Sequence, residues 1–467
     1  MFAKIQRIHF VGIGGIGMSG IAEVLLNMGY KVSGSDLKES SVTDRLRSLG
    51  ASILLGHRGE NVTGADVVVT SSAISRNNPE IVAAQSAKIA LVQRAEMLAE
   101  LMRLKYGIAV AGMHGKTTTT SMVAAVLAAG GLDPTIVVGG RVDALGSNAR
   151  LGKSQYLVAE ADESDRSFLK LSPIIAVVTN LDREHMDCYR DMADVEQTFV
   201  EFLDRLPFYG MAVLCNDDEG LRKLIPRLAR RTLTYGLTPG SDFGVRMLPQ
   251  QKRSSPDQAC AINRFTVTYN GKALGDFSLY VPGMHNVLNA SAAIAVGVGL
   301  EIPAAQIAEA LSQFRGVDRR FQLKGRAAGV SVIDDYGHHP TEIRATLAAA
   351  RQCGYGRIHV IFQPHRYTRT RDLIDDFASA FHDCDSLQVL DIYAASEQAI
   401  DGISGELLVK RIRHPKNARY AASFQDAVEF AAANSTADDM VLTLGAGSVS
   451  QIGPMLLEQL AATVKAV

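Results

Sequence analysis

Short apolar runs of strand length alternate with helix-like segments along almost the whole chain, and this alternation limits the fold more than any other feature. The first run covers Ile8–Ile13 and the last covers Met440–Leu444. A regular alternation of strands and helices predicts parallel sheets covered by helices, which is the α/β class. Further runs begin at the following residues: Val67, Ile89, Gly107, Tyr156, Ile174, Val330, Ile358 and Leu387.

The apolar runs fall into three sets, each sufficient for a sheet of its own. A chain of 467 residues also exceeds what one core usually organises. We therefore expect three domains, at residues 1–105, 106–316 and 317–467. A polar segment, Pro249–Gln258, is expected to be a surface loop, and the segment after it, Arg264–Val281, to be rich in β-structure.

Composition excludes several classes of protein. The formal net charge of −1 gives no general attraction to nucleic acid or to an acidic membrane surface. The five cysteines are odd in number and scattered, which argues against a disulfide framework and against a zinc site. No run of 18 apolar residues and no signal-peptide pattern occurs. We expect a cytoplasmic protein without nucleic-acid or membrane partners.

A phosphate-binding loop is the strongest local signal. Gly112–Thr119 reads Gly-Met-His-Gly-Lys-Thr-Thr-Thr between a predicted strand that ends at Ala111 and a predicted helix over 116–129. Glycines let backbone amides face an anion, Lys116 would neutralise the β- and γ-phosphates, and Thr117 would offer a hydroxyl to Mg²⁺. Val110 occupies the first glycine position of the usual motif. The alternative is a glycine-rich turn that binds nothing.

Acidic residues follow the next strands of the same set. The strand at Tyr156 ends in Glu160-Ala-Asp-Glu-Ser-Asp165, and Glu160, its last residue, is the first candidate for a Mg²⁺ ligand. The other acids of this turn are equally consistent with solvated loop residues. His185, after the strand at Ile174, is a candidate for holding a second ion or orienting a substrate, although a lone loop histidine is more often structural.

A second glycine-rich turn lies near the N-terminus. Gly12-Ile-Gly14-Gly-Ile-Gly17 follows a strand, and Asp36 lies further along, as in dinucleotide-binding folds. An NAD-dependent oxidoreductase is therefore an alternative. The pattern specifies a pyrophosphate and not a nicotinamide, so a diphosphate-linked substrate on this turn and ATP on the other explain both motifs.

Taken together and in this order, the motifs resemble those of the Mur ligases over essentially the whole length. Besides the phosphate loop and the turn at Glu160, the resemblance rests on these segments: Gly12–Gly20, Ser71–Ile74, Pro282–Ala290, Arg319–Gln322, Asp334–Pro340 and Gln363–Arg369. The resemblance implies an N-terminal Rossmann-like domain for a UDP-sugar, a central P-loop ATPase and a C-terminal Rossmann-like domain. Within the family, the chain is most similar to the alanine-adding branch.

The resemblance also implies a reaction and its participants. The lactyl carboxylate of UDP-N-acetylmuramate attacks the γ-phosphate of ATP, with Mg²⁺ present, and the amine of L-alanine then displaces phosphate from the acyl phosphate through a tetrahedral intermediate. Such chemistry depends on charge neutralisation and alignment. It belongs to cytoplasmic synthesis of peptidoglycan precursors, and we expect a monomer or weak homodimer. Rivals are a ligase that attaches an intact peptide during cell-wall recycling and a non-catalytic nucleotide-dependent interaction module.

Site residues carry over from the matching motifs. Lys116, Glu160, His185 and Arg320 are implied to be catalytic, with Thr117, Glu160 and His185 as metal ligands. The nucleotide is implied to contact Gly112, His114, Gly115, Lys116, Thr117, Thr118, Asn286, Asn289, Arg320 and Asp335. The sugar nucleotide and the amino acid are implied to contact Gly14, Gly15, Ile16, Gly17, Asp36, Ser71, Ser72, His185, Tyr336, His338, Arg366 and Arg369.

Alternatives remain for several of these residues. Asn286 and Asn289 would equally serve to cap a helix start, and Arg320 with Arg319 would equally form a solvated pair. Arg366 and Arg369 suit an amino-acid carboxylate, whereas a basic patch for nucleic acid is a weaker interpretation because acidic residues follow at once. The sequence departs from the family pattern at Met113, where threonine is usual, and at Arg166, where a small residue is usual. No lysine lies between Lys170 and Lys223, so we expect no carbamylated lysine.

Overall fold

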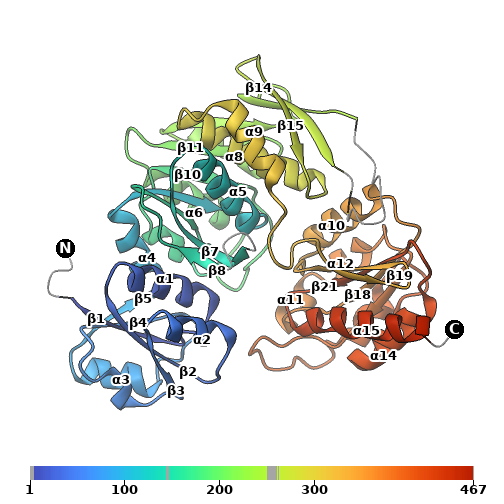
Figure 1. The fold of residues 1–467 in the computed structure, drawn as a ribbon, viewed down its shortest axis with the longest axis horizontal. Helices are drawn as coiled ribbons and strands as arrows, with labels where there is room; N and C mark the ends of the chain where they lie inside the picture. Colours follow the sequence, from blue (N-terminus) through green and yellow to red (C-terminus); the bar gives the residue numbers. More distant parts are fainter. Residues whose placement is uncertain (1–4, 143–146, 250–259, 261, 466–467) are drawn as a thin grey trace. The chain divides into compact units, whose positions relative to one another are not determined.

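Three separate sheets organise the protein, as the alternation of strands and helices predicts (Figure 1). The structure, a computed structural model, describes residues 5–142, 147–249, 260 and 262–465. Within those residues no helix is long and apolar enough to span a membrane. The expected polar loop at Pro249–Gln258 lies outside the described residues except for Pro249.

The first sheet is five-stranded and parallel, with the order β3-β2-β1-β4-β5 and helices on both of its sides (Figure 1). The strand order reverses between β1 and β4, and the glycine-rich turn follows β1 at this point. Ligands of open α/β sheets bind at such a reversal. The elements are β1 (Arg7–Val11), α1 (Ile16–Asn27), β2 (Lys31–Asp36), α2 (Ser41–Ser48), β3 (Ser52–Leu55), β4 (Val67–Thr70), α3 (Pro79–Ser86), β5 (Ala90–Gln93) and α4 (Arg94–Arg103).

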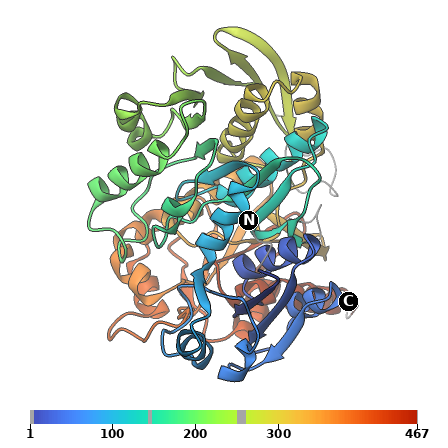
Figure 2. The same ribbon diagram turned by 90° about the vertical axis from the view of Figure 1, so that its left-hand side faces the viewer.

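The central sheet has ten strands in the order β15-β14-β13-β12-β11-β10-β6-β9-β7-β8, and its β14–β15 hairpin is visible in both ribbon views (Figures 1 and 2). The strand β6 (Tyr106–Ala111) lies between β10 (Ile175–Val178) and β9 (Tyr156–Glu160) and is parallel to both. The other strands are β7 (Thr135–Val142), β8 (Ser147–Arg150), β11 (Met211–Cys215), β12 (Arg231–Gly236), β13 (Phe243–Met247), β14 (Asn263–Tyr269) and β15 (Lys272–Leu279). The helices are α5 (Lys116–Ala129), α6 (Met192–Asp204), α7 (Glu219–Leu224), α8 (Met284–Gly299) and α9 (Ala304–Gln313).

The third sheet has six strands in the order β16-β17-β21-β18-β19-β20, and only β16 is antiparallel to its neighbour among the strands described. Its strands are β16 (Gln322–Ala327), β17 (Val330–Asp335), β18 (Ile358–Phe362), β19 (Ser386–Val389), β20 (Arg419–Tyr420) and β21 (Met440–Leu444). Its helices are α10 (Pro340–Gln352), α11 (Tyr367–Asp372), α12 (Ile374–Ala380), α13 (Gly405–Arg411), α14 (Phe424–Asn434) and α15 (Ile452–Lys465). Two buried apolar clusters pack on this sheet.

The chain packs into two compact units. The first consists of residues up to Arg246 together with Thr266–Asp276 and Leu288–Leu311, and the second contains the remaining residues. The three-domain α/β architecture is confirmed, whereas the boundaries expected at residues 105 and 316 stay a prediction. All five cysteines are free thiols; four are buried and Cys188 is partly exposed.

A buried carboxylate contacts side chains from two strands of the first sheet and from the segment after β3. Glu80, at the start of α3, is fully buried and accepts hydrogen bonds from Ser35 Oγ (2.6 Å) and Asn61 Nδ2 (2.5 Å). The ring nitrogens of His9 and His57 lie 3.5 and 3.6 Å from its Oε2. Burial alone would raise the pKa of Glu80, but hydrogen bonds from His9, Ser35 and Asn61 outweigh it and lower that pKa to about 2.

Glu80→Gln should therefore destabilise the protein in a pH-dependent way. The folded pKa of about 2 is below the ordinary 4.5, so the ionised group stabilises the fold above pH 4.5 and loses this effect as the pH falls towards 2. The shift corresponds to roughly 3 kcal/mol at neutral pH. Denaturant unfolding of both proteins across this range should show a gap that shrinks with acid. An equal gap at both ends would contradict the prediction, and Glu39→Gln, at an exposed ion pair with Arg47, is the control.

Candidate functional site

The phosphate loop joins β6 to α5 and can be built only with glycine at two positions. Gly112 and Gly115 have positive φ angles of 120° and 81°. A Cβ on Gly112 would lie 2.2 Å from Thr179 Oγ1, and one on Gly115 would lie 2.7 Å from Asn289 Oδ1. Because Gly115 caps α5 without a side-chain hydrogen bond, the helix start keeps amide groups for a ligand.

Lys116 is the first residue of α5, and its ammonium group folds back over the loop. Its Nζ donates to Gly112 O (2.8 Å), to Met113 O (3.2 Å) and to the carboxylate Oε1 of Glu163 (2.7 Å). Burial alone would lower the pKa of Lys116, but attraction by Glu163 and Glu160 outweighs it and raises the pKa. The lysine is therefore a fixed positive charge at the loop. Met113 is buried, and nothing else in the structure explains why methionine stands where threonine is usual.

The predicted metal ligands Thr117 and Glu160 are in contact. The hydroxyl of Thr117 donates to both carboxylate oxygens of Glu160, at 3.0 and 3.1 Å, and the backbone N–H of Gly139 donates to Oε2 at 2.5 Å. Glu160 is the last residue of β9, as expected. The two side chains thus lie together at the carboxyl end of the strands β6 and β9.

Glu163 belongs to the same site, although the sequence pattern did not single it out among the acids of its turn. It is fully buried, and its Oε2 has no hydrogen-bond partner in the described part of the chain. Its Oε1 contacts Lys116 and lies 3.7 Å from Nε2 of His185. Burial raises the pKa of Glu163, and Lys116 opposes this effect.

These groups fit a divalent cation. A buried carboxylate oxygen without a partner, a second carboxylate and a hydroxyl are the oxygen ligands that Mg²⁺ prefers. His185 lies beside them and has a positive φ of 57°, which is uncommon for a residue with a side chain. The chemistry of the donor set thus agrees with a magnesium site at the predicted ligands Thr117, Glu160 and His185, to which the structure adds Glu163.

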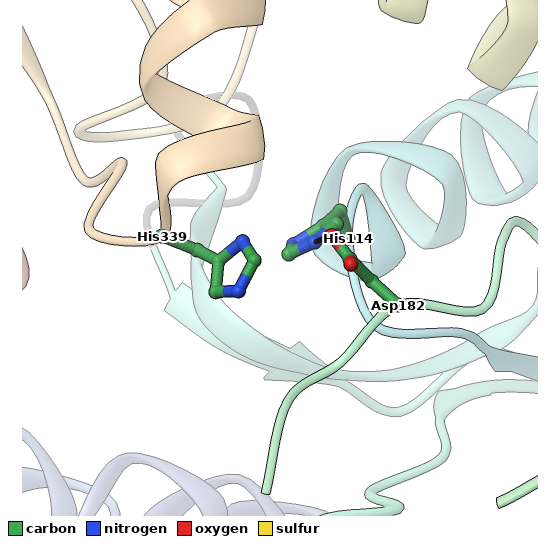
Figure 3. Close-up of side chains that lie close together, drawn as sticks. All are labelled: His114, Asp182 and His339. Carbon is green, nitrogen blue, oxygen red and sulfur yellow. Dashed lines mark hydrogen bonds and ion pairs between the residues drawn. The ribbon is translucent and has the colours of Figure 1, made fainter. Parts of the chain in front are cut away.

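His114 links the phosphate loop to the loop after β10. Its Nε2 lies 2.8 Å from a carboxylate oxygen of Asp182, and Figure 3 shows the two side chains facing each other. Its backbone N–H donates to Oδ1 of Asn180 at 2.9 Å. The carboxylate of Glu184 lies 3.8 Å from the other ring nitrogen. Thr118 is buried in the first turn of α5.

The two candidate asparagines lie one turn apart on α8. Asn286 is buried, and its Nδ2 donates to the carbonyl oxygen of Pro282, just before the helix, at 2.7 Å. Asn289 is buried against the phosphate loop at Gly115. The structure therefore brings Asn289 to the loop.

The N-terminal turn is built around Asp36. The backbone N–H of Gly14 donates to Oδ2 of Asp36 at 2.9 Å. Gly15 precedes α1, whose first two residues are Ile16 and Gly17. Of the remaining candidates, Ser71 and Ser72 directly follow β4, at the same edge of the sheet: Thr70 is its last residue.

Arg94 and Asp162 were missed by the sequence reasoning. Arg94 begins α4, and a Cβ on Gly17 would lie 3.1 Å from its guanidinium Nη1. Its Nη2 donates to Oδ2 of Asp162 at 2.9 Å, across 68 residues of sequence. The position of Arg94 directly after β5, at the carboxyl edge of the first sheet, was the one signal that could have indicated it. Its cation lies beside the glycine-rich turn.

In the second unit, Arg319 and Arg320 are not a solvated pair, so that alternative is wrong. Arg319 Nε donates to Asp334 at 3.1 Å, while Arg320 lies 3.6 Å from a carboxylate oxygen of Glu342. Asp335, the last residue of β17, is buried and accepts from the backbone N–H groups of residues 321 and 337, both at 2.8 Å. Burial raises the pKa of Asp335, and the charge of Arg320 opposes this.

Aromatic and basic side chains gather beside Asp335. The Arg320 guanidinium lies 5.0 Å from the ring centre of Tyr336, and the rings of Tyr336 and His338 are 5.6 Å apart. The sequence reasoning did not select His365. Its ring centre lies 5.5 Å from that of His338, and its backbone carbonyl accepts a hydrogen bond from Arg369 Nη1 at 3.1 Å. Arg366, with φ of 70°, precedes α11.

Comparison with known families and proteins gives a consistent result. Three family models match in succession: "Mur ligase family, catalytic domain" at residues 7–106, "Mur ligase middle domain" at 110–297 and "Mur ligase, glutamate ligase domain" at 319–447. The UDP-N-acetylmuramate–L-alanine ligase of Koribacter versatilis is 69% identical over 99% of both chains. That of Acidobacterium capsulatum is 63% identical over 98% of this chain and 99% of the relative.

Solved structures agree with these matches. The UDP-N-acetylmuramate–alanine ligase of Thermotoga maritima superposes with a TM-score of 0.81 at 30% identity, covering 98% of this chain and 99% of the other. A murein peptide ligase of Psychrobacter arcticus has the same fold, with a TM-score of 0.68 at 24% identity over 98% of this chain and 99% of the other. Three family models match in succession, and a relative is 69% identical over 99% of both chains. This chain therefore belongs to the Mur ligase family.

Proposed function

We propose that the protein joins L-alanine to the lactyl carboxylate of UDP-N-acetylmuramate, with conversion of ATP to ADP and phosphate, in cytoplasmic synthesis of peptidoglycan precursors. The observation that carries this proposal is the 69% identity, over 99% of both chains, to a relative named for this reaction. Since the chain belongs to a ligase family, the alternative of an NAD-dependent oxidoreductase is abandoned. We keep the expectation of a monomer or weak homodimer without nucleic-acid or membrane partners.

The site in the first unit suits the phosphoryl-transfer step. The amides of the phosphate loop and the ammonium of Lys116 would bind and align the phosphates, so that the substrate carboxylate can attack the γ-phosphorus. Thr117, Glu160 and His185, together with Glu163, would hold a Mg²⁺ ion that would neutralise charge on the phosphates. We assign His114, Thr118 and Asn289 to the nucleotide because they lie in or against the phosphate loop.

The acyl phosphate formed in this way is an activated carboxyl group with phosphate as its leaving group. The amine of L-alanine then attacks the carbonyl carbon, and phosphate departs from the tetrahedral intermediate. In the second unit we assign Arg320 and Asp335 to the nucleotide, and Tyr336, His338, Arg366 and Arg369 to the amino acid. Asn286 is assigned to the adenine side of the nucleotide. The guanidinium groups of Arg366 and Arg369 suit the carboxylate of the amino acid.

The N-terminal turn suits the diphosphate of the sugar nucleotide. Gly14, Gly15, Ile16 and Gly17 would present backbone amides at the start of α1, while Asp36, Ser71 and Ser72 lie at the same edge of the sheet.

The three domains are proposed at residues 1–105, 106–316 and 317–467.

Phosphate release with different acceptors tests the proposed function. The protein is mixed with ATP, Mg²⁺ and UDP-N-acetylmuramate, and L-alanine, L-serine, glycine or the tripeptide L-alanyl-γ-D-glutamyl-meso-diaminopimelate is added. We expect L-alanine to raise the rate at least about tenfold over the reaction without acceptor, and the tripeptide to have no effect. A rate that rises with the tripeptide alone would identify a peptide ligase of recycling. No rise with any acceptor would exclude both ligases.

Arg94→Ala should raise the KM for the sugar nucleotide by about tenfold to a hundredfold, because a cation beside the proposed diphosphate site is lost. The KM for ATP should change less than about twofold. Steady-state kinetics with each substrate varied measures both values. Glu96→Gln is the matched control, since it removes another ion pair of α4, to Lys170 at 2.6 Å, away from the glycine-rich turn. Equal effects of the two variants would contradict a role for Arg94 at the diphosphate.

A further inference from the structure

Two loops leave the central sheet on either side of the phosphate loop. Because β6 lies between β10 and β9, the turn that carries Glu163 and the loop that carries His185 start from strands that are not neighbours. The hydrogen bonds of the sheet fix the ends of these strands at Glu160 and Val178, but not the side chains of Glu163 and His185, which lie beyond those ends. Contacts made by the loops themselves must fix the positions of these side chains.

Arg166 makes the first of these contacts. It directly follows the acidic turn, residues Glu160–Asp165, and has a positive φ of 59°. Its Nη2 donates to the carboxylate of Asp194 and to Cys188 O, the latter at 3.2 Å. Its Nη1 lies 3.4 Å from Thr198 Oγ1, and its guanidinium lies 4.7 Å from the ring centre of Tyr189. The side chain of Arg166 thus contacts both the loop after His185, at Cys188 and Tyr189, and the following helix α6, at Asp194 and Thr198.

Tyr189, in the loop after His185, makes a second contact, to the backbone of the acidic turn. Its ring is buried, and its hydroxyl donates to the backbone carbonyl of Glu163 at 2.6 Å. That carbonyl also accepts from the backbone N–H of Arg166 at 3.1 Å. The N–H groups of Cys188 and Tyr189 donate to His185 O at 2.8 and 3.1 Å. Tyr189 is therefore hydrogen-bonded to the backbone of both Glu163 and His185, and Cys188, which Arg166 contacts, is hydrogen-bonded to the backbone of His185.

His185 needs such support. A positive φ strains a residue that has a side chain and persists only where surrounding contacts fix it; the φ of His185 is 57°. The fixed backbone places its Nε2 at 3.7 Å from Oε1 of Glu163. We propose that Arg166, together with Tyr189, is a positioning residue that sets the separation of His185 and Glu163 and thereby the affinity for the divalent cation that accompanies the nucleotide. This rests on the proposed function for the identity of the ligand.

Binding of Mn²⁺ in the presence of ADP, followed by electron paramagnetic resonance, tests the proposal without turnover. Arg166→Ala should weaken Mn²⁺ binding about tenfold, as is usual when a group that supports metal ligands is lost. Tyr189→Phe, which removes only the hydroxyl, should weaken it in the same direction. Arg166→Lys keeps the charge beside Asp194 and should recover part of the affinity. In assays, the Mg²⁺ concentration for half-maximal rate should rise while kcat at saturating Mg²⁺ changes less than about threefold.

Arg190→Ala is the matched control. Arg190 contacts the same carboxylate, with its Nε 3.5 Å from Asp194, but its side chain is 85% exposed. This variant should bind Mn²⁺ like the unaltered protein. Wild-type affinity in folded Arg166→Ala and Tyr189→Phe, verified by circular dichroism, would overturn the proposal, as would an equal loss in Arg190→Ala. If the unaltered protein forms no product with any acceptor, the proposed function fails, whereas the Mn²⁺ measurement still decides the role of Arg166.

Discussion

Lys116→Ala is expected to lower phosphate release by at least about a hundredfold to a thousandfold, because phosphoryl transfer depends on charge neutralisation at the phosphates. The substitution also leaves the buried carboxylate of Glu163 without the ammonium group that lies 2.7 Å away. A buried carboxylate without a cation becomes protonated or repels the incoming nucleotide. Rates at saturating ATP, followed by phosphate release, should show the loss in kcat.

Two further measurements separate loss of catalysis from loss of the fold. Binding of UDP-N-acetylmuramate, measured by calorimetry, should be largely unchanged in Lys116→Ala, because the sugar nucleotide is assigned to the first sheet. Lys105→Ala removes another lysine of the same unit, one whose Nζ donates to Ser154 O at 2.6 Å, and should leave turnover nearly intact. Unchanged turnover in Lys116→Ala would remove the phosphate loop from the mechanism.

Gly115→Ala is expected to weaken nucleotide binding by at least about tenfold, because its effect combines strain with a clash. The positive φ of 81° makes a side chain costly by about 1–2 kcal/mol, and the new Cβ would lie 2.7 Å from Asn289 Oδ1. Either the loop or α8 must move, and the amides at the helix start then no longer converge on the phosphates. Titration with ADP measures the loss.

Gly131→Ala isolates the contribution of the strain alone. Gly131 follows the same helix with a similar φ of 75°, but a Cβ there would meet no atom within 4 Å. We expect Gly131→Ala to lower the melting temperature through backbone strain alone and Gly115→Ala to lower it at least as much, while only Gly115→Ala binds ADP weakly. Equal ADP affinity in the two variants would show that the contact with Asn289 is unimportant for the loop.

Periodicity was sufficient to predict the elements that carry the phosphate loop. The expected helix over 116–129 coincides with α5, and Glu160 ends β9 as expected. Both predictions rest on signals that are local in the chain, namely a glycine before a helix and an apolar run of strand length. Such signals locate the backbone of a site reliably because strand and helix ends are fixed by neighbouring residues.

Side-chain burial could not be predicted in the same way. The turn at Glu160 contains several acids, and nothing in their order tells which one is enclosed; the structure buries Glu163 fully beside Lys116. The contact between Arg94 and Asp162 joins residues 68 positions apart, beyond the reach of any periodic pattern. Arg319 and Arg320 look alike in the sequence, yet only the fold gives each its own carboxylate.

The distribution of the thiols offers a practical route for spectroscopy. Four of the five cysteines are buried, whereas Cys188 is partly exposed. A maleimide dye or nitroxide reagent should therefore attach selectively at Cys188 in the unaltered protein. Because Cys188 lies in the loop that follows His185, the label would report changes in that loop in real time as nucleotide and metal bind, without any engineered attachment point.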